Sequence, residues 1–270
     1  MAKQEAILAF LLSDSGQETQ YDHLHKWLLQ SCEVLKADGT APFDFISAGG
    51  SLVSFELNNI LAKFEKKGLI SQNGHIRVED SEAMMELGRK LDLTLQLKIR
   101  AEVKQDKPIN NLYVFNLEWT PTVDTGYIYT TGYEGKTLDA FLISLLESGI
   151  KTLIDVRCNA VSRKFGFSKK QLGQACQVAG LDYVHMPELG IPSESRQSLK
   201  TQQDYDSLFY SYKVDILPVR QKEKKLVSEM SDANPCALMC YEANPMQCHR
   251  TCLAQDIADS CGKKIKNIGG

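Results

Sequence analysis

The chain has 270 residues, of which 43% are hydrophobic and 24% are charged, and its formal net charge is −3. This composition is typical of a folded globular protein and excludes a disordered one. No apolar run approaches the roughly 18 residues that a membrane-spanning helix needs. The first residues also lack the small-residue cleavage pattern of a signal peptide. We therefore expect a cytoplasmic protein with no membrane partner.

The charges are distributed almost evenly between the two halves of the chain. Residues 1–120 contain 13 basic and 17 acidic residues, and the rest contains 18 basic and 17 acidic residues. Neither half has the basic excess that is typical of a strong nonspecific nucleic-acid binder. The eight cysteines do not predict disulfides, because a cytoplasmic chain keeps its thiols reduced. They are instead candidates for nucleophiles or ligands.

The first hundred residues predict a small α+β domain. Apolar residues at helical spacing predict helices over residues 4–13 and 23–35. Ser54 is a candidate cap of a third helix that ends at Gly68, and Asn73-Gly74 predicts a hairpin. Another helix is predicted over residues 81–99.

Three helices followed by a hairpin is the order of a winged helix, and residues 43–70 resemble a winged-helix segment. We therefore predict a winged-helix-like domain over residues 1–100 and a polar linker over residues 101–122. The alternative for the first domain is a small helical packing or oligomerisation module. Its expected partner is a nucleic acid or another protein.

Residues 123–270 alternate between strands and helices. Short apolar strands are predicted within 126–135, 151–157, 181–186, 236–241 and 263–268. The intervening helices are predicted over 136–149 and 168–180, around 202–230, and over 249–262. This alternation predicts an α/β domain with a mostly parallel sheet and helices on both faces.

The stretch MCYEANPMQCHR, residues 239–250, concentrates reactive side chains at one expected edge of that sheet. Cys240 is predicted at the carboxyl end of a strand, and Arg250 opens the next helix. Asp155 and Arg157 follow another strand and should reach the same edge. A helix N-terminus and two guanidinium groups favour a bound anion, and they also lower the pKa of a nearby thiol.

Four ordered motifs resemble the family catalogued as domain of unknown function 488, over residues 126–270. They are TTGYEGKTLDAFLISLLESGIKTLIDVR, SRKFGF, YVHMPELG and MCYEANPMQCHR. The resemblance implies no established reaction. Its pattern falls on Gly132, Tyr133, Asp155, Arg157, Ser162, Arg163, Gly166, Phe167, Glu188, Leu189, Gly190, Cys240, Glu242, Cys248, His249 and Arg250.

Cys158 and Asn159 depart from this pattern, because relatives often carry small residues or proline there. The order of strand, cysteine, loop and arginine also resembles rhodanese domains. The ten positions from Cys240 to Arg250 are, however, longer than a compact rhodanese loop.

We assign candidate roles by side-chain chemistry. Cys240 or Cys248 is the candidate nucleophile, and Glu242 and His249 are the proton handlers. Asp155 is an acid–base partner or orients its neighbouring arginine. The candidate substrate-binding residues are Tyr133, Arg157, Arg163 and Arg250.

Each of these residues also has a purely structural interpretation. Buried thiols often only pack, and a basic loop is often only solvated. The thiols and His249, with His185 or Glu242, are a possible zinc set, but the spacing Cys-x7-Cys-His matches no common zinc pattern. We therefore expect no metal and no cofactor.

The resulting hypothesis is an enzyme that acts on a phosphate-bearing substrate, either a nucleotide or a nucleic acid. A cysteine-dependent hydrolase or transferase is the enzyme class that fits. Two alternatives stay open: a noncatalytic winged-helix regulator or sensor, and rhodanese-like sulfur transfer.

Overall fold

The computed structural model describes residues 3–39, 43–48, 51–104, 114–116, 124–196, 199 and 201–269. The chain forms two compact units, Met1–Asn116 and Leu117–Gly270. None of the helices in the described ranges is both long enough and apolar enough to cross a bilayer.

The helices of the N-terminal unit largely follow the sequence pattern. The Ser54 hydroxyl accepts a hydrogen bond from the Leu57 N–H at 3.4 Å and caps the third helix as predicted. The prediction of one helix over residues 81–99 is wrong. The Asp92 carboxylate accepts hydrogen bonds from the Thr94 and Leu95 N–H groups and starts a new helix there. The helices are α1 (Lys3–Asp14), α2 (Tyr21–Ala37), α3 (Phe55–Lys66), α4 (Ser81–Gly88) and α5 (Leu93–Lys104).

Two small sheets complete this unit. The predicted hairpin is confirmed, and Gly74 supplies the positive φ of its turn, 79°. The first sheet has the order β1-β5-β4, with β1 (Glu18–Thr19), β4 (Ile70–Gln72) and β5 (Ile76–Val78). The second has the order β3-β2-β6, with β2 (Phe45–Ala48), β3 (Ser51–Val53) and β6 (Val114–Asn116).

The second sheet was not predicted, because its strands are short and lie among turn-forming residues. Strand β6 lies inside the predicted linker. The resemblance to a winged helix is not confirmed and stays a prediction.

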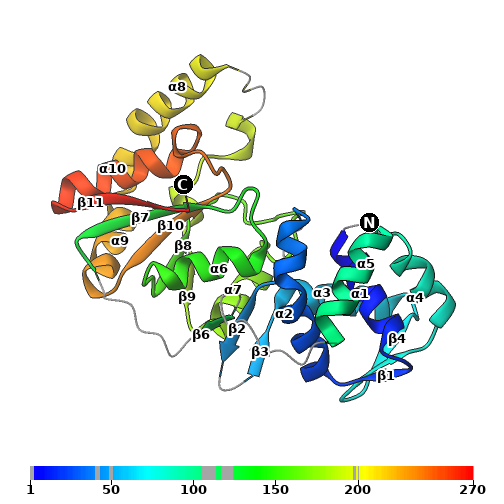
Figure 1. Ribbon diagram of the computed structural model, residues 1–270. Coiled ribbons are helices and arrows are strands. Elements are labelled where there is room, and N and C mark those ends of the chain that lie inside the picture. The colour runs from blue at the N-terminus through cyan, green and yellow to red at the C-terminus, as the bar shows by residue number, and fades with distance from the viewer. Residues whose placement is uncertain are drawn as a thin grey trace. The chain divides into compact units, whose positions relative to one another are not determined.

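A five-stranded parallel sheet forms the centre of the C-terminal unit, as predicted (Figure 1). In the register of its strands, Cys240 lies opposite Gly132 and Met239 lies opposite Asp155. The carboxyl ends of three neighbouring strands therefore meet at one edge. The order is β11-β7-β10-β8-β9, with β7 (Tyr127–Gly132), β8 (Thr152–Asp155), β9 (Asp182–His185), β10 (Cys236–Cys240) and β11 (Lys264–Ile268).

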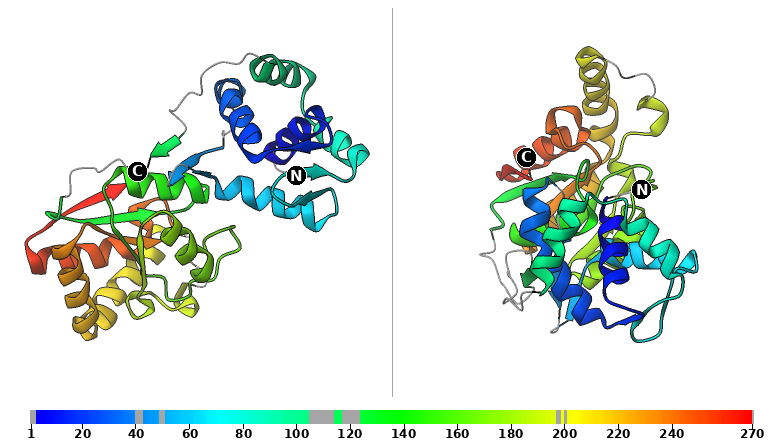
Figure 2. Two further views of the ribbon diagram at one scale, coloured as in Figure 1. Left: turned by 90° about the horizontal axis from the view of Figure 1, so that it is seen from below. Right: turned by 45° about the vertical axis from the view of Figure 1, so that its right-hand side comes forward.

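Helices cover both faces of this sheet. Figures 1 and 2 show α6 (Leu138–Glu147) and α7 (Lys169–Val178) on one face, with α9 (Gln221–Ala233) and α10 (His249–Cys261) on the other. On the second face, Leu238 and Ile154 of the sheet share a buried core with Leu253 of α10. The chain moves along the sheet in one direction from β7 to β9 and then returns through β10 to β11. Because crossovers between parallel strands are right-handed, the helices of the outward and return paths lie on opposite faces.

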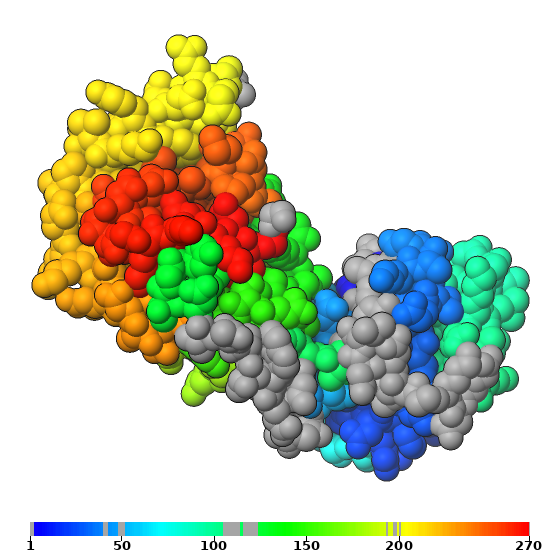
Figure 3. Space-filling model, turned by 60° about the vertical axis from the view of Figure 1, so that its left-hand side comes forward, coloured from blue at the N-terminus to red at the C-terminus, as the bar shows by residue number. Residues whose placement is uncertain are grey.

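The single helix predicted around residues 202–230 is two helices. Helix α8 (Gln202–Ser211) leads into a π turn (Tyr212–Ile216) and a 3₁₀ turn (Leu217–Val219) before α9 begins. Pro218 lies in this break, where it cannot donate a backbone hydrogen bond. Figure 3 shows atoms of α8 and α9 bordering those of α10 and β11 on one face of the unit.

A tight contact between α1 and α4 gives a testable prediction. A Cβ atom added at Gly88 would lie 2.9 Å from the Phe10 Cα atom. We expect Gly88→Ala to lower the free energy of unfolding of the N-terminal unit by about 1–3 kcal/mol. This loss should outweigh the gain of about 1 kcal/mol in helix propensity. Chemical denaturation followed by circular dichroism measures the difference, and an unchanged or higher stability would contradict the packing.

Candidate functional site

The edge where the parallel strands end gathers four side chains, Cys240, Glu242, Cys248 and His249, which we call the thiol cluster. Cys240 is the last residue of β10, and Cys248 directly precedes α10, of which His249 is the first residue. The Cys240 Sγ atom lies 3.2 Å from Glu242 Oε2 and 3.7 Å from His249 Nδ1. The structure thus brings together four of the five predicted catalytic residues.

His249 has a defined proton arrangement. Its Nε2 atom lies 3.2 Å from the Val156 carbonyl oxygen, which can only accept, so Nε2 carries a proton. In the neutral ring, Nδ1 then presents a lone pair. Arg196 donates to Nδ1 at 3.4 Å, and the Cys240 sulfur lies on the same side of the ring.

The two thiols of the cluster differ in acidity. A hydrogen bond from Cys248 lowers the pKa of Cys240 well below its ordinary value against the cost of burial, and the charges of a protonated His249 and of Arg196 act in the same direction. Burial raises the pKa of Cys248, and the neighbouring Cys240 raises it further. The thiolate of the pair therefore resides on Cys240.

Both carboxylate oxygens of Glu242 have a polar partner, Cys240 at Oε2 and Arg196 at Oε1. Burial raises its pKa, and the charge of Cys240 acts in the same direction. Its Oε1 atom forms an ion pair with Arg196 at 3.0 Å. Sequence reasoning missed Arg196, because it lies in an irregular segment more than forty residues before the cysteine motif. Only its charge hinted at a role.

The predicted pair of Asp155 and Arg157 forms a buried network. Arg157 donates through Nε and Nη2 to the Asp155 carboxylate at 2.8 and 2.6 Å. It also donates to the Tyr133 hydroxyl at 2.8 Å and to the Phe167 carbonyl at 2.9 Å. The Tyr183 hydroxyl donates to the same carboxylate at 2.7 Å. Asp155 is fully buried, so it orients Arg157.

Arg250 is also buried, with 1% of its surface exposed. Its guanidinium donates to the carbonyl oxygens of Glu242 and Ala243. It therefore holds the loop after β10. Whether it also binds an anion stays a prediction.

Gly132 explains how this loop can lie so close to β7. A Cβ atom at Gly132 would lie only 1.9 Å from the Glu242 carbonyl oxygen. The Tyr133 and Glu134 N–H groups donate to the Tyr241 carbonyl at 3.1 and 2.9 Å. The close backbone approach therefore positions Glu242 over the sheet edge.

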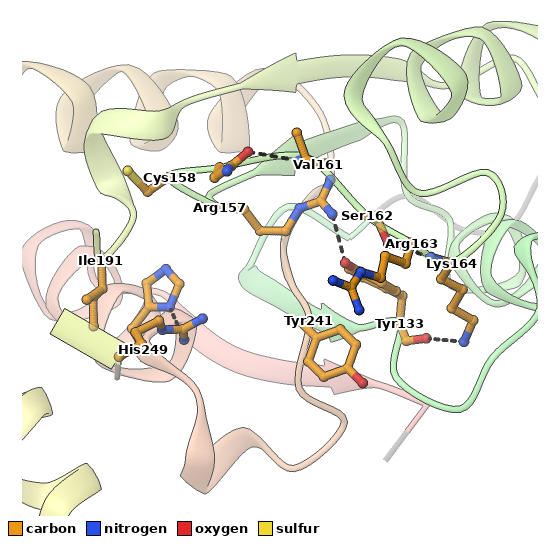
Figure 4. A pocket seen from close by; sticks show the side chains of 12 residues that line it. Tyr133, Arg157, Cys158, Val161, Ser162, Arg163, Lys164, Ile191, Tyr241 and His249 are labelled. Carbon is orange, nitrogen blue, oxygen red and sulfur yellow. Dashed lines mark hydrogen bonds between the residues drawn. The ribbon is translucent and has the colours of Figure 1, made fainter. Parts of the chain in front are cut away.

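Beside the cluster lies a pocket of about 500 Å³, which we call the basic pocket. In Figure 4, His249 and Lys164 lie toward opposite ends of the pocket, with Tyr241 between them. Cys240 and Cys248 are not among the lining residues, so His249 connects the pocket to the thiols. The pocket is lined by Tyr133, Arg157, Cys158, Asn159, Val161, Ser162, Arg163, Lys164, Ile191, Arg196, Tyr241 and His249.

A second pocket, of about 450 Å³, reaches the cluster from the side of α8. Cys248 and Cys252 line it together with Lys213. The donor atoms of Cys240, Cys248 and His249 all lie within 4.8 Å of one another, and this group could hold a metal ion.

Comparison with known proteins supports the resemblance seen in the sequence. Residues 137–257, somewhat less than half of the chain, match the family model described as Domain of unknown function DUF488. The search of curated proteins returned no match. The search of solved structures returned none either.

The two tyrosines of the basic pocket make a matched pair for a test of the Arg157 network. Tyr133→Phe removes the oxygen that accepts from Arg157 Nη1 and leaves a buried donor unpaired. We expect a loss of about 1–3 kcal/mol in the free energy of unfolding. Tyr241 is 45% exposed, and Tyr241→Phe should change it by less than about 0.5 kcal/mol. Equal effects in denaturation of the two variants would contradict the network.

Proposed function

We propose that the C-terminal unit is an enzyme that binds a phosphate-bearing substrate in the basic pocket and acts on it at the thiol cluster. The observation that carries the proposal is the charge of the pocket. Three arginines and a lysine line it, and none of its lining residues is acidic. A phosphate group complements such a wall, and arginine forks are well suited to it.

The charges of the pocket are not all compensated. Arg157 is paired with Asp155, and Arg196 with Glu242. Arg163 is exposed and forms no ion pair with any residue that the structure describes. Lys164 donates to the Tyr133 carbonyl at 3.0 Å, and burial lowers its pKa. Arg163 and Lys164 are therefore the side chains that we expect to contact the phosphate.

The size and aromatic lining of the pocket favour a nucleotide or the end of a nucleic-acid strand. Its volume falls within the range of about 300–1,000 Å³ that is typical of small-molecule sites. Tyr241 lines it and is 45% exposed, so its ring is accessible to a base. Stacking on an exposed aromatic ring is a common way to hold a base without reading its sequence.

His249 is the side chain best placed to move a proton between the pocket and the cluster. It lines the pocket, and its Nδ1 atom lies 3.7 Å from the Cys240 sulfur. The Cys240 sulfur and Glu242 carboxyl, 3.2 Å apart, share a proton in this arrangement. A histidine next to such a pair is suited to general acid–base catalysis.

For the N-terminal unit we propose a winged-helix-like module that binds a partner. The pairing order β1-β5-β4 next to α1, α2 and α3 supports this assignment. The last turn of α3 carries Lys63 and Lys66, and its first turn carries Glu56, so its charges favour neither DNA nor protein.

Substitution of Arg163 and Lys164, the two cations that we expect to contact the phosphate, tests the proposed function. Arg163→Ala and Lys164→Ala should each weaken the binding of inorganic phosphate or a mixed nucleotide pool by about tenfold, and the double variant by more. Isothermal titration calorimetry measures the affinity. Raising the ionic strength should weaken binding to the unmodified chain, because exposed charges are screened.

The control is Lys169→Ala, because Lys169 is exposed at the start of α7 and does not line the pocket. A second variant, His249→Gln, should keep anion binding but lose turnover of a phosphorylated substrate. Absence of anion binding in the unmodified chain, or equal losses in Lys169→Ala and Arg163→Ala, would refute the proposal.

A further inference from the structure

We propose that Cys240, Glu242, Cys248 and His249 form a tetrahedral binding site for one Zn²⁺ ion. The inference does not rest on the proposed function, because anion binding in the basic pocket does not require the ion. It does change the roles of Cys240, Glu242 and His249, since with the ion bound they are ligands and not the nucleophile and the proton-transfer groups.

The separations of the donor atoms fit a tetrahedral ion. Zinc bonds of about 2.3 Å to sulfur and 2.0–2.2 Å to nitrogen or oxygen place neighbouring donor atoms of a tetrahedron about 3.3–3.8 Å apart. The Cys240 sulfur lies 3.7 Å from His249 Nδ1 and 3.2 Å from Glu242 Oε2. The two sulfurs and the imidazole nitrogen all lie within 4.8 Å of one another. Glu242 lies outside this group of three and is paired with Arg196 at 3.0 Å, so its carboxylate would turn from Arg196 toward the ion to become the fourth ligand.

The surroundings of His249 give a second, independent indication. Histidines that bind metals usually donate their other ring N–H to a carbonyl or carboxylate, which fixes the tautomer. Here the Nε2 atom of His249 lies 3.2 Å from the Val156 carbonyl oxygen. That contact fixes the proton on Nε2 and leaves the Nδ1 lone pair near the Cys240 sulfur, where a bound ion would replace the 3.4 Å contact of Arg196 with Nδ1. The imidazole is thus held as a ligand would be.

The ligand set would balance the charge of a divalent ion once bound. Zinc would displace the protons of both thiols, and the two thiolates, the Glu242 carboxylate, Arg196 at 3.0 Å from Glu242, and the ion would then sum to zero. Two sulfur donors and an imidazole select a borderline-soft ion such as Zn²⁺ over Mg²⁺ or Ca²⁺, which prefer oxygen.

The spacing Cys-x7-Cys-His argued against zinc, because it does not match the short ligand spacing of common zinc sites. In the folded chain the loop between the two cysteines turns back, so the ligands still come together. Cys240 ends β10, and the backbone bonds of Arg250 to Glu242 and Ala243 fold the loop back toward the start of α10. The ion would therefore join a strand end to a helix start.

The experiment uses the full chain after treatment with a chelator and a reductant. It is then titrated with Zn²⁺ against a chromophoric competitor, and separately with Co²⁺. We expect one tightly bound equivalent of zinc. With Co²⁺ we expect thiolate-to-cobalt charge-transfer absorption and intense visible bands of a four-coordinate ion. Weak octahedral bands without charge transfer, or no bound equivalent, would overturn the proposal.

Variants locate the ion. Cys240→Ser, Cys248→Ser and His249→Gln should each reduce the zinc affinity by more than the roughly 10–100-fold that follows loss of an outer-shell partner. The matched control is the double variant Cys236→Ser/Cys252→Ser. It removes a buried thiol from β10 and a half-buried one from α10, outside the cluster. Equal losses in the control and the ligand variants would mean adventitious binding to thiols and overturn the site.

If a thiol variant fails to fold, Glu242→Gln and the cobalt spectrum of the unmodified chain still decide the question. Glu242→Gln should weaken zinc binding and shift the visible bands, but keep the thiolate charge transfer. Arg163→Ala should leave zinc binding unchanged. Phosphate binding is measured on the metal-free chain, so failure of the zinc site and failure of the proposed function are distinguishable.

Discussion

The buried ion pair of Asp155 and Arg157 is the interaction on which the sheet edge of the C-terminal unit depends. It joins the end of β8 to Tyr183 of β9, to Tyr133 after β7 and to the Phe167 carbonyl. Breaking a buried pair costs far more than an exposed one, because it leaves a charge without a partner. One wall of the basic pocket is therefore rigid.

The second constraint is the backbone approach at Gly132. The absence of a side chain lets the Glu242 carbonyl rest against β7, and Arg250 then holds the loop from the other side. The loop in turn positions the Glu242 carboxyl beside Cys240. A residue of the family pattern that has no chemistry of its own thus determines the geometry of the cluster.

The sequence was most informative where local patterns and the final fold agree. Buried β8 and β10 and the helices that follow them were predicted from apolar runs and spacing, and parallel pairing placed Cys240 near Asp155. It was least informative about contacts between distant segments. Arg196 reaches Glu242 and His249 from an irregular segment with no periodic pattern. The short strands β2, β3 and β6 carry too few residues for alternation to be seen.

The sequence by itself determined the α/β class of the second unit, the edge at which its reactive residues gather, and the resemblance to an uncharacterised family. These follow from periodicity and from the rule that parallel strands share a carboxyl edge. Only the tertiary structure decided which groups are free. It shows Arg250 bound to the loop and Arg157 to Asp155, while Arg163 forms no ion pair within the described residues. The reason is physical, because burial and partner geometry depend on residues far apart in the chain.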